Sequence, residues 1–209
     1  MMIHQWQTPE KRTHRGHFVT VRPLDAMNDG IALYGAGHRT PAHLYTWQYL
    51  PYGPFADVAA LQVWLADRQN QTDPLFHTVC EAQSGRPVGI ITIMSIVSEF
   101  GRAELGHIWY DVDIQRTSLT TEATYLLLTY LFDQLHYRRV EWKCDAHNIR
   151  SRNAALRLGF SYEGTFRKHM LVKGQNRDTA WFSMLDNEWP QRKSRFNAFF
   201  AGASKRLAH

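Results

Sequence analysis

The sequence has little cysteine and no long apolar run. Its two cysteines, Cys80 and Cys144, lie far apart in segments that are typical of strands, so we expect reduced thiols of a cytoplasmic protein rather than a disulfide. No apolar run approaches the length of about 18 residues that a transmembrane helix requires, and no membrane span is expected. Residues 1–15 are polar and lack the apolar core of a signal peptide, so secretion is not expected.

The sequence also lacks internal repeats, low-complexity tracts and a convincing linker. Its 209 residues, 44% of them hydrophobic, fit one domain with a substantial core. We divide the chain into a polar N-terminal arm over 1–17, expected to be extended or loosely tied, a single domain over 18–187, and a tail over 188–209. The tail is predicted to form an amphipathic helix whose apolar residues are Trp189, Phe196, Phe199 and Phe200. This apolar face could form the contact of a homodimer.

No long basic run occurs before residues 191–206, although the formal net charge is +5. A positive charge without a basic run favours a local site for an anion over an extended nucleic-acid face. A solvated surface with scattered Lys and Arg is the alternative.

The stretch from Gly106 to Phe160 is the part around which the rest is organised. Residues 106–112 are rich in aromatic and β-branched residues and predict a strand. A polar turn follows over 113–123, with hydroxyls placed to accept from the first free N–H groups of a helix that continues to about His136. Glu122 is expected on the side of this helix opposite its apolar face. A strand over 139–144 and a helix from Asn148 to Gly159 complete a parallel βαβ unit.

The start of the long helix is therefore a predicted anion site. Its N–H groups converge on one point that the helix dipole makes positive, and phosphate is the natural ligand.

The flanking segments predict a mixed α+β sheet. Strands are expected over 18–24, 74–81, 87–98 and 102–112, with helices over 26–35 and 57–70 and a short helix plus loop over 39–55. Two further strands over 162–172 and 179–185 are joined by a turn at 173–176.

This element order resembles the GNAT superfamily of acetyl-CoA-dependent N-acetyltransferases. The residues that carry the resemblance are Ala103-Glu104-Leu105-Gly106-His107-Ile108-Trp109, Thr121-Glu122-Ala123, and Asn148 with Ser151 through Leu158-Gly159-Phe160 to Glu163-Gly164. They are similar to the branch that acetylates the N-termini of ribosomal proteins. The resemblance spans roughly residues 19–189 and implies a GNAT-like fold, with antiparallel strands before the βαβ unit and a hairpin after it. It also implies acetyl-CoA as cofactor and a small-molecule or peptide amine as acceptor.

The resemblance implies which residues bind the cofactor. Pantetheine would run along the strand that holds Ile108, Trp109 and Tyr110 and would contact Asn148. The phosphates would lie at the turn formed by Gln115, Arg116, Thr117, Ser118, Leu119, Thr120 and Thr121. This turn departs from the superfamily pattern, because Ser118 stands where glycine is usual and Thr120 where a small residue is usual. We expect binding to survive, since the backbone N–H groups remain.

The resemblance also implies catalytic roles. Glu104 is expected to act as general base or to orient the amine; the alternative is a surface carboxylate paired with Arg102. His107 is the rival base by residue type, and strand alternation predicts that it faces away from Glu104. Ser151 is the candidate proton donor to the leaving thiolate. Direct attack by the amine needs neither an enzyme nucleophile nor a metal, so Cys144 is interpreted as a buried strand residue.

The acceptor would meet an aromatic segment. Tyr45, Trp47, Tyr49 and Tyr52, together with His107, would form a wall for a peptide N-terminus or an aryl or alkyl amine, or else lie in ordinary core. The cations of the last hairpin would border the other side and could favour acidic acceptors or be solvated: Arg167, Lys168, His169, Lys173 and Arg177. Two other functions stay open: a CoA-binding regulatory module without catalysis, and a basic nucleic-acid-binding domain.

Overall fold

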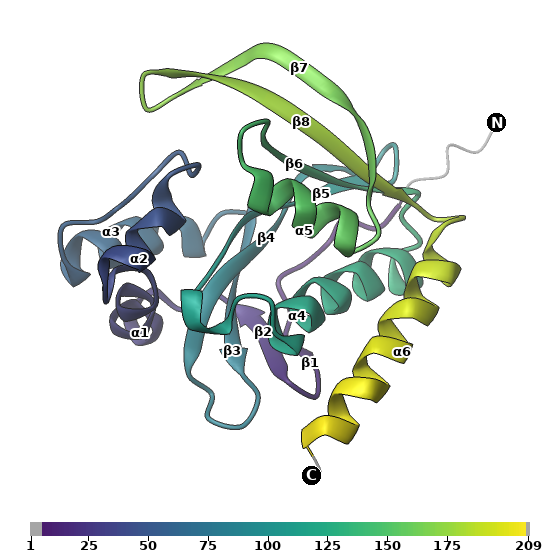
Figure 1. Ribbon diagram of the computed structural model, residues 1–209, viewed down its shortest axis with the longest axis horizontal. Helices are drawn as coiled ribbons and strands as arrows, with labels where there is room; N and C mark the ends of the chain where they lie inside the picture. The colour runs from purple at the N-terminus through teal and green to yellow at the C-terminus, as the bar shows by residue number, and fades with distance from the viewer. Residues whose placement is uncertain (1–5, 208–209) are drawn as a thin grey trace.

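The computed structural model describes residues 6–207, the side chains of residues 204–207 excepted. One eight-stranded sheet runs through the molecule in the order β1-β2-β3-β4-β5-β6-β8-β7 (Figure 1). Its strands are β1 His14–Arg15, β2 Val19–Pro23, β3 Leu75–Glu81, β4 Pro87–Val97, β5 Arg102–Tyr110, β6 Arg139–Asp145, β7 Ser161–Val172 and β8 Gln175–Leu185. Only β5 and β6 pair in parallel; every other neighbouring pair is antiparallel. The predicted mixed sheet is confirmed.

The helices begin where the sequence supplies capping residues. Asp25 accepts from the N–H of Asn28 at 3.1 Å, and Asp57 accepts from the N–H of Ala60 at 2.8 Å, as side-chain caps do. The α-helices are α1 Ala26–His38, α2 Pro41–Leu44, α3 Val58–Gln69, α4 Ser118–Thr129, α5 Ile149–Arg157 and α6 Trp189–Leu207. Shorter turns of helix are η1 Tyr45–Trp47, η2 Val112–Ile114 and η3 Tyr130–Gln134.

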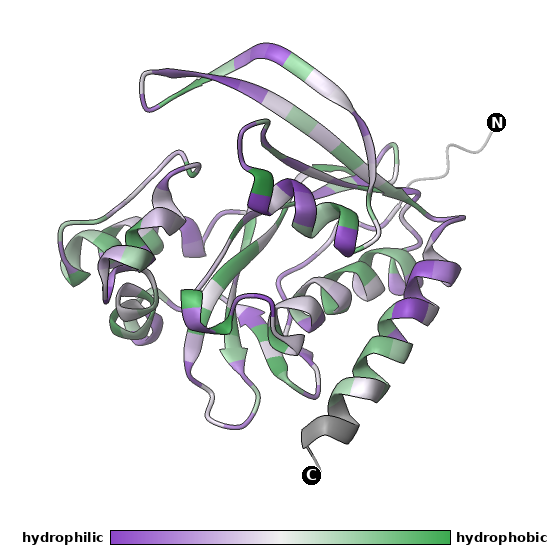
Figure 2. Ribbon diagram, viewed as in Figure 1, coloured by the Kyte–Doolittle hydropathy of each residue, from purple (hydrophilic) through white to green (hydrophobic). Residues whose placement is uncertain are grey.

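Helices cover both faces of the sheet, and a separate core lies under each layer. One core joins the sheet to α4, α5 and α6, with Val79, Leu105 and Leu127 among its residues. The other joins the sheet to α1, η1 and α3, with Phe76 and Trp109 among its residues. Figure 2 shows hydrophobic colour along the inner strands and along α4 and α6, with polar colour at many of the turns. This is the distribution that burial of apolar area produces.

The two parallel strands separate soon after they meet. Pairing of β5 with β6 is confined to residues 102–104 and 139–141, and Glu104 opposite Glu141 is the last pair. The remainder of β5 therefore has no β6 neighbour, and a gap opens towards the start of α4. The βαβ unit thus leaves an opening of the kind that could take an extended ligand arm as an added strand.

A β-bulge interrupts β5 where the gap opens. Ile90 pairs with Trp109 and Thr92 pairs with Gly106, so β5 advances by three residues where β4 advances by two. Within this extra length of β5, His107 has a positive φ of 48°. His107 packs against Phe76, with ring centroids 5.2 Å apart, on the α1–α3 side of the sheet. The expectation that His107 faces away from Glu104 is wrong, because the bulge reverses the alternation between them.

Other differences concern the ends of elements. The long helix is α-helical only to Thr129 and continues as a π turn in η3. Strand β8 begins at Gln175 rather than 179, because Lys173 and Gly174, with φ of 49° and 76°, make a two-residue turn. Of the two expectations for the arm, extended or loosely tied, the first holds at residues 14–15, which form β1 and pair with β2; residues 1–5 of the arm lie outside the described residues. In the predicted tail helix α6, Trp189, Phe196 and Phe200 pack against Tyr125 of α4.

Glu122 also departs from expectation, because it is buried. Its side chain accepts from three backbone N–H groups, those of His17, Phe18 and Val19, at 2.9, 2.6 and 2.9 Å. The carboxylate therefore provides the hydrogen-bond acceptor for three backbone N–H groups at the turn between β1 and β2.

The β7–β8 hairpin arches away from the sheet towards the α1–α3 layer (Figure 1). At its turn, the ammonium of Lys173 donates to the carbonyl oxygens of Trp47 at 2.8 Å and Gly53 at 2.6 Å. The hairpin is thereby joined to the loop that follows η1.

Candidate active site

The N-terminus of α4 has no side-chain cap. Thr117 occupies the cap position, but its hydroxyl donates to the carbonyl of Ile114 at 2.7 Å. The hydroxyls of Thr120 and Thr121 donate to the carbonyl of Thr117. The expectation that these hydroxyls serve the first N–H groups is wrong, and those N–H groups remain available to an anion.

Serine at position 118 strains nothing in this turn. Ser118 opens α4 with a helical backbone, and the positive φ of the turn, 63°, lies at Arg116. Glycine's freedom at positive φ is therefore not needed at Ser118, which explains how the glycine-less turn forms.

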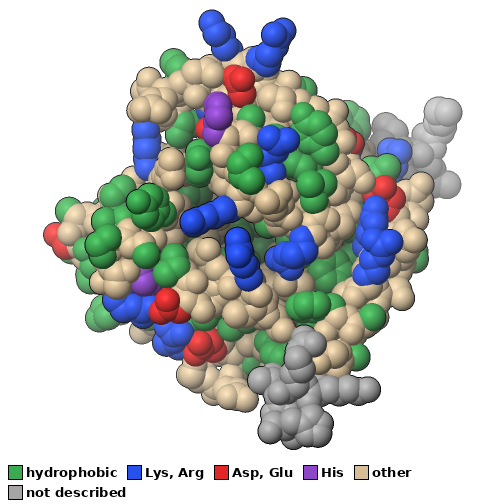
Figure 3. Space-filling model, in the orientation of Figure 1, with side chains coloured by type: hydrophobic (Ala, Val, Ile, Leu, Met, Phe, Trp, Pro, Cys, Tyr) green, Lys and Arg blue, Asp and Glu red, His purple; other side chains and the backbone are tan. Residues whose placement is uncertain are grey.

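Two arginines add positive charge to the same helix start. Arg157 of α5 donates to the hydroxyl of Thr121 at 3.1 Å, and burial together with nearby Arg116 lowers the pKa of its guanidinium. Neither arginine forms an ion pair within residues 6–203. Lys and Arg side chains surround a hollow near the middle of the face shown in Figure 3. Adjacent cations without carboxylates suit a polyanionic ligand.

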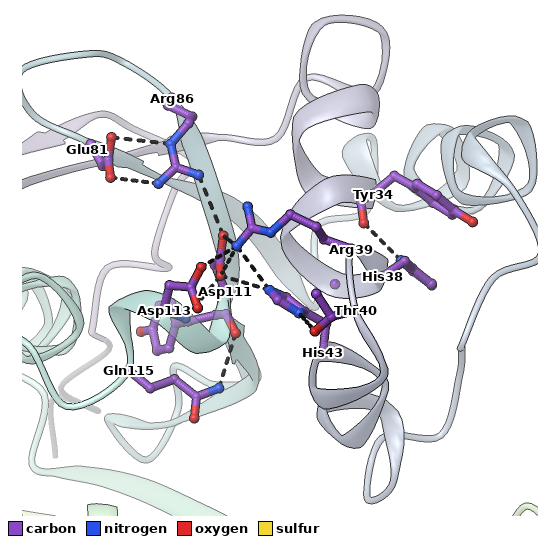
Figure 4. Close-up of polar contacts among 12 residues, drawn as sticks. Tyr34, His38, Arg39, Thr40, His43, Glu81, Arg86, Asp111, Asp113 and Gln115 are labelled. Atoms are coloured by element: carbon purple, nitrogen blue, oxygen red, sulfur yellow. Dashed lines mark hydrogen bonds and ion pairs between the residues drawn. The ribbon is translucent and has the colours of Figure 1, made fainter.

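Asp111 anchors the chain just before this turn (Figure 4). Its buried carboxylate contacts the guanidinium of Arg39 at 3.2 Å, the Nε2 of His43 at 3.2 Å and the guanidinium of Arg86 at 3.5 Å. Arg39 also pairs with the exposed Asp113. The network fixes η2 against α1 and α2, so the position of the turn before α4 depends on these two helices.

His43, Asp111 and Asp113 lie close enough together to hold a metal ion. The Nη2 of Arg39, however, already lies among them, 3.1 Å from the Nε2 of His43. The arginine supplies the positive charge that the two carboxylates require, so this cluster is a structural ion-pair network.

The strand expected to bind pantetheine, β5, is anchored because its side chains pack into the cores on both faces of the sheet. Trp109 lies in the α1–α3 core and Tyr110 in the α4–α6 core, while Ile108 is partly buried. With these side chains directed into the two layers, the backbone of β5 forms the edge of the gap.

Asn148 and Ser151 lie together across the gap, at the start of α5. Asn148 caps the helix by accepting from the N–H of Ser151 at 3.1 Å. The hydroxyl of Ser151 accepts from the indole N–H of Trp142 at 3.0 Å, and Ser151 also lies within hydrogen-bond reach of the Cys144 thiol. Burial raises the pKa of the Cys144 thiol, which fits the prediction of a structural cysteine.

Glu104 is buried, and only one of its carboxylate oxygens is engaged. Its Oε2 lies 2.9 Å from the ammonium of Lys143 and accepts from the hydroxyl of Ser95 at 3.1 Å. A Cβ placed on Gly106 would lie 3.6 Å from Oε1, so the free oxygen faces the bulge. The alternative of a surface carboxylate paired with Arg102 is wrong, because Glu104 is buried and Arg102 pairs with Glu141 at 3.3 Å.

A cavity of about 340 Å³ lies beside the bulge on the α1–α3 side. Its lining residues are Pro51, Tyr52, Arg68, Gln71, Pro74, Phe76 and His107. Burial, with Arg68 and Arg177 nearby, lowers the pKa of His107 to about 4. The imidazole is therefore neutral at physiological pH and available as a hydrogen-bond acceptor.

Among the aromatic residues expected to meet the acceptor, only Tyr52 lines this cavity. Trp47 is 1% exposed and lies in the core, where its indole N–H donates to the carbonyl of Gly37. Tyr45 is 66% exposed, and the hydroxyl of Tyr49 donates to the carbonyl of His147 at 3.3 Å.

Sequence reasoning missed Arg68, Lys143 and Arg157 as members of the site. Lys143 lies between Trp142 and Cys144 on β6. A lysine between two apolar residues of a predicted strand is unusual, and this signal could have identified it. Arg68 and Arg157 occupy late positions on helices, where a basic residue is ordinary, so no pattern in the sequence distinguished them.

Comparisons with known proteins agree with this geometry. Residues 19–161 match the family model described as an acetyltransferase (GNAT) domain. A crystal structure of a GCN5-related N-acetyltransferase from Brucella melitensis is 40% identical, with a TM-score of 0.90, over 93% of this chain and 87% of that chain. An acetyltransferase structure of the GNAT family from Chromobacterium violaceum is 41% identical, with a TM-score of 0.82, over 90% of this chain and 92% of that chain.

A curated relative matches less of the chain. YdaF of Bacillus subtilis, provisionally named a ribosomal N-acetyltransferase, is 30% identical over 109 residues, which are 52% of this chain and 59% of that protein. Within residues 6–207, no helix combines the length and apolar character that crossing a bilayer requires. The family model covers most of the sheet, including the gap between β5 and β6 and the uncapped start of α4, and the chain belongs to the GNAT acetyltransferase family.

Proposed function

We propose that this protein is an acetyl-CoA-dependent N-acetyltransferase that moves the acetyl group directly to a primary amine. The observation that carries the proposal is the arrangement along β5. The strand leaves β6 at Glu104, bulges at His107, and ends at an uncapped helix start flanked by Arg116 and Arg157. An anion site and an acceptor cavity thus lie at the two ends of one open strand edge.

The residues present fit the cofactor. The N–H groups that open α4, with Arg116 and Arg157, would hold its phosphates, as helix starts and guanidinium groups do. The unpaired edge of β5 at Ile108, Trp109 and Tyr110 would hydrogen-bond its arm, opposite Asn148. When bound, the cofactor supplies an activated acetyl thioester.

Glu104 is placed to accept the proton of the attacking amine. Lys143 and Ser95 hold Oε2 and so fix the carboxylate, while Oε1 faces Gly106 at the bulge. A fixed carboxylate with one free oxygen can take the proton directly or through one water. A backbone N–H near the bulge would stabilise the oxyanion.

Ser151 is the proposed donor to the leaving group. The new bond joins the amine nitrogen to the acetyl carbon, and the carbon–sulfur bond breaks. The amine proton passes to Glu104, and the thiolate receives a proton from Ser151, which solvent replaces. The indole of Trp142 orients this hydroxyl by donating to it.

The experiment has two stages. Acetyl-CoA should raise the melting temperature in proportion to the logarithm of its concentration, and Arg157→Gln should weaken that shift. Thiol release from acetyl-CoA is then followed with a panel of primary amines, with the exposed Glu99→Gln as the matched control for Glu104→Gln. Stabilisation without thiol release from any amine would leave a CoA-binding module, and absence of stabilisation would exclude both functions.

A further inference from the structure

One arginine lines the cavity beside His107, and a second, distant in the sequence, lies near that histidine. Arg68, from the end of α3, forms part of its lining. Arg177, from β8, lies close enough to His107 that its charge lowers the pKa of the imidazole, as the charge of Arg68 also does. Both guanidinium groups therefore act on the His107 imidazole, and Arg68 does so from the cavity wall.

Both arginines retain unused donors. Arg68 pairs through Nη1 with Asp67, whose side chain is largely exposed, and it lies over the ring of Trp64. Its Nε and Nη2 have no hydrogen-bond partner among the described side chains. The Nε of Arg177 is buried without any partner. Buried donors left without acceptors are rare in folded proteins, and each costs free energy until it meets an acceptor.

No carboxylate lines the cavity. Glu104, the nearest acidic residue along β5, is already held by Lys143 and Ser95. A second ammonium group on an acceptor would therefore meet positive charge and no counter-ion. A carboxylate would meet two guanidinium groups that can bind it in fork geometry.

The rest of the lining is flat and largely apolar. Tyr52 stacks on His107 with ring centroids 5.5 Å apart, and the ring of Phe76 also contacts the imidazole, at 5.2 Å between centroids. The hydroxyl of Tyr52 is buried without a partner, which gives a further donor beside the aromatic rings. This surface suits an aromatic or branched apolar group.

We propose that the acceptor is a small primary amine that also carries a carboxylate and an apolar side chain, such as a hydrophobic α-amino acid. The proposal rests on the function proposed above. Arg68 and Arg177 bind the carboxylate, Tyr52 and Phe76 contact the side chain, and the amine lies at the bulge near Glu104. Polyamines and other acceptors with two ammonium groups are excluded by charge, because the cavity offers them no anion.

Matched acceptors test this assignment. Phenylalanine and phenethylamine differ only in the carboxylate, and phenylalaninamide keeps the shape without the charge. We expect kcat/KM for phenylalanine to exceed that for phenethylamine by about 10- to 100-fold, the usual discrimination of a hydrogen bond to a charged group. Arg68→Gln and Arg177→Gln should each remove most of this difference while leaving phenethylamine turnover within about twofold. Arg167→Gln, an exposed arginine of the same hairpin, is the control.

A binding measurement separates this proposal from the activity itself. Calorimetry with N-acetylphenylalanine and its amide, in the presence of CoA, reports the carboxylate site without turnover. Preference for the acid that both arginine variants abolish would support the site, even if no amine were acetylated and the proposed function failed. Equal affinity for acid and amide, no binding of either, or faster acetylation of phenethylamine or of an N-terminal peptide than of phenylalanine would overturn the proposal.

Discussion

Lys143 and Glu104 form an ion pair of 2.9 Å where the last residue pair joins β5 to β6. Lys143 also lies 3.1 Å from Glu141 and 4.0 Å from the ring centroid of Trp181. The ammonium is thus held on three sides, and it fixes the carboxylate at the point where the gap begins.

Glu104→Gln should lower kcat/KM by about 10²- to 10⁴-fold near neutral pH, the usual contribution of a general base. The deficit should shrink as pH rises towards the pKa of the amine, because the acceptor then loses its proton to solvent. Affinity for acetyl-CoA, measured by calorimetry, should stay within about twofold. Turnover equal to that of the Glu99→Gln control at every pH would remove Glu104 from the mechanism.

Asp111→Asn should lower the free energy of unfolding by about 1–3 kcal/mol, because the buried side chain loses the negative charge that strengthens its hydrogen bonds to Arg39 and His43. Asp113→Asn should cost less than about 1 kcal/mol, because its side chain is 68% exposed and surface ion pairs contribute little. Urea unfolding of the two variants checks this contrast. Equal losses would show that the network around Asp111 is not what holds the turn before α4.

Ser118→Gly should change the Kd of acetyl-CoA by less than about threefold, because the helical backbone at this position needs no glycine. Arg116→Gln should weaken binding by about 10-fold through the loss of one charge-assisted contact. Calorimetric titration measures both. A glycine variant that binds ten times more tightly would mean that the serine Cβ obstructs the phosphates.

The free energy of unfolding should fall as pH decreases from about 6.5. Burial, with Arg12 nearby, lowers the pKa of His14 to about 4, and burial, with His14 nearby, lowers that of His77 to about 3. Below about 6.5 the unfolded imidazoles take up protons and the folded ones do not, which favours unfolding. Each histidine contributes a slope of about 1.4 kcal/mol per pH unit, down to its folded pKa.

Denaturant titrations between pH 7 and 4.5 measure this slope. His14→Gln should flatten it, whereas His147→Gln, at a side chain that is 77% exposed, should leave it unchanged. A pH-independent unfolding free energy across this range would contradict the assignment of the two buried imidazoles.

Local patterns in the sequence predicted the elements and the order in which they occur. Helices begin after the capping residues Asp25, Asp57 and Asn148. Such starts are visible in the sequence because a cap and the N–H group that it accepts from are only three residues apart. The side of the sheet that His107 faces was mispredicted, since a bulge is set by pairing with a distant strand. The Asp111 network could not be predicted for the same reason, as its partners lie 68 and 72 positions away.

The proposed acceptor side was less predictable than the proposed cofactor side. The turn over 115–121 is a continuous segment with a motif, whereas the cavity collects Tyr52, Arg68 and His107 from three separate segments. The sequence marked the aromatic segment as a whole, but it could not show that Trp47 turns into the core.

The bonds from Glu122 to the backbone of residues 17–19 span 103 to 105 positions. During synthesis on the ribosome, the first hairpin therefore emerges long before its carboxylate partner. Three amides of that hairpin must remain hydrated until α4 has left the exit tunnel and docked. The turn between β1 and β2 thus receives its carboxylate partner only after α4 exists, so a nascent chain halted before residue 122 cannot close this edge of the sheet.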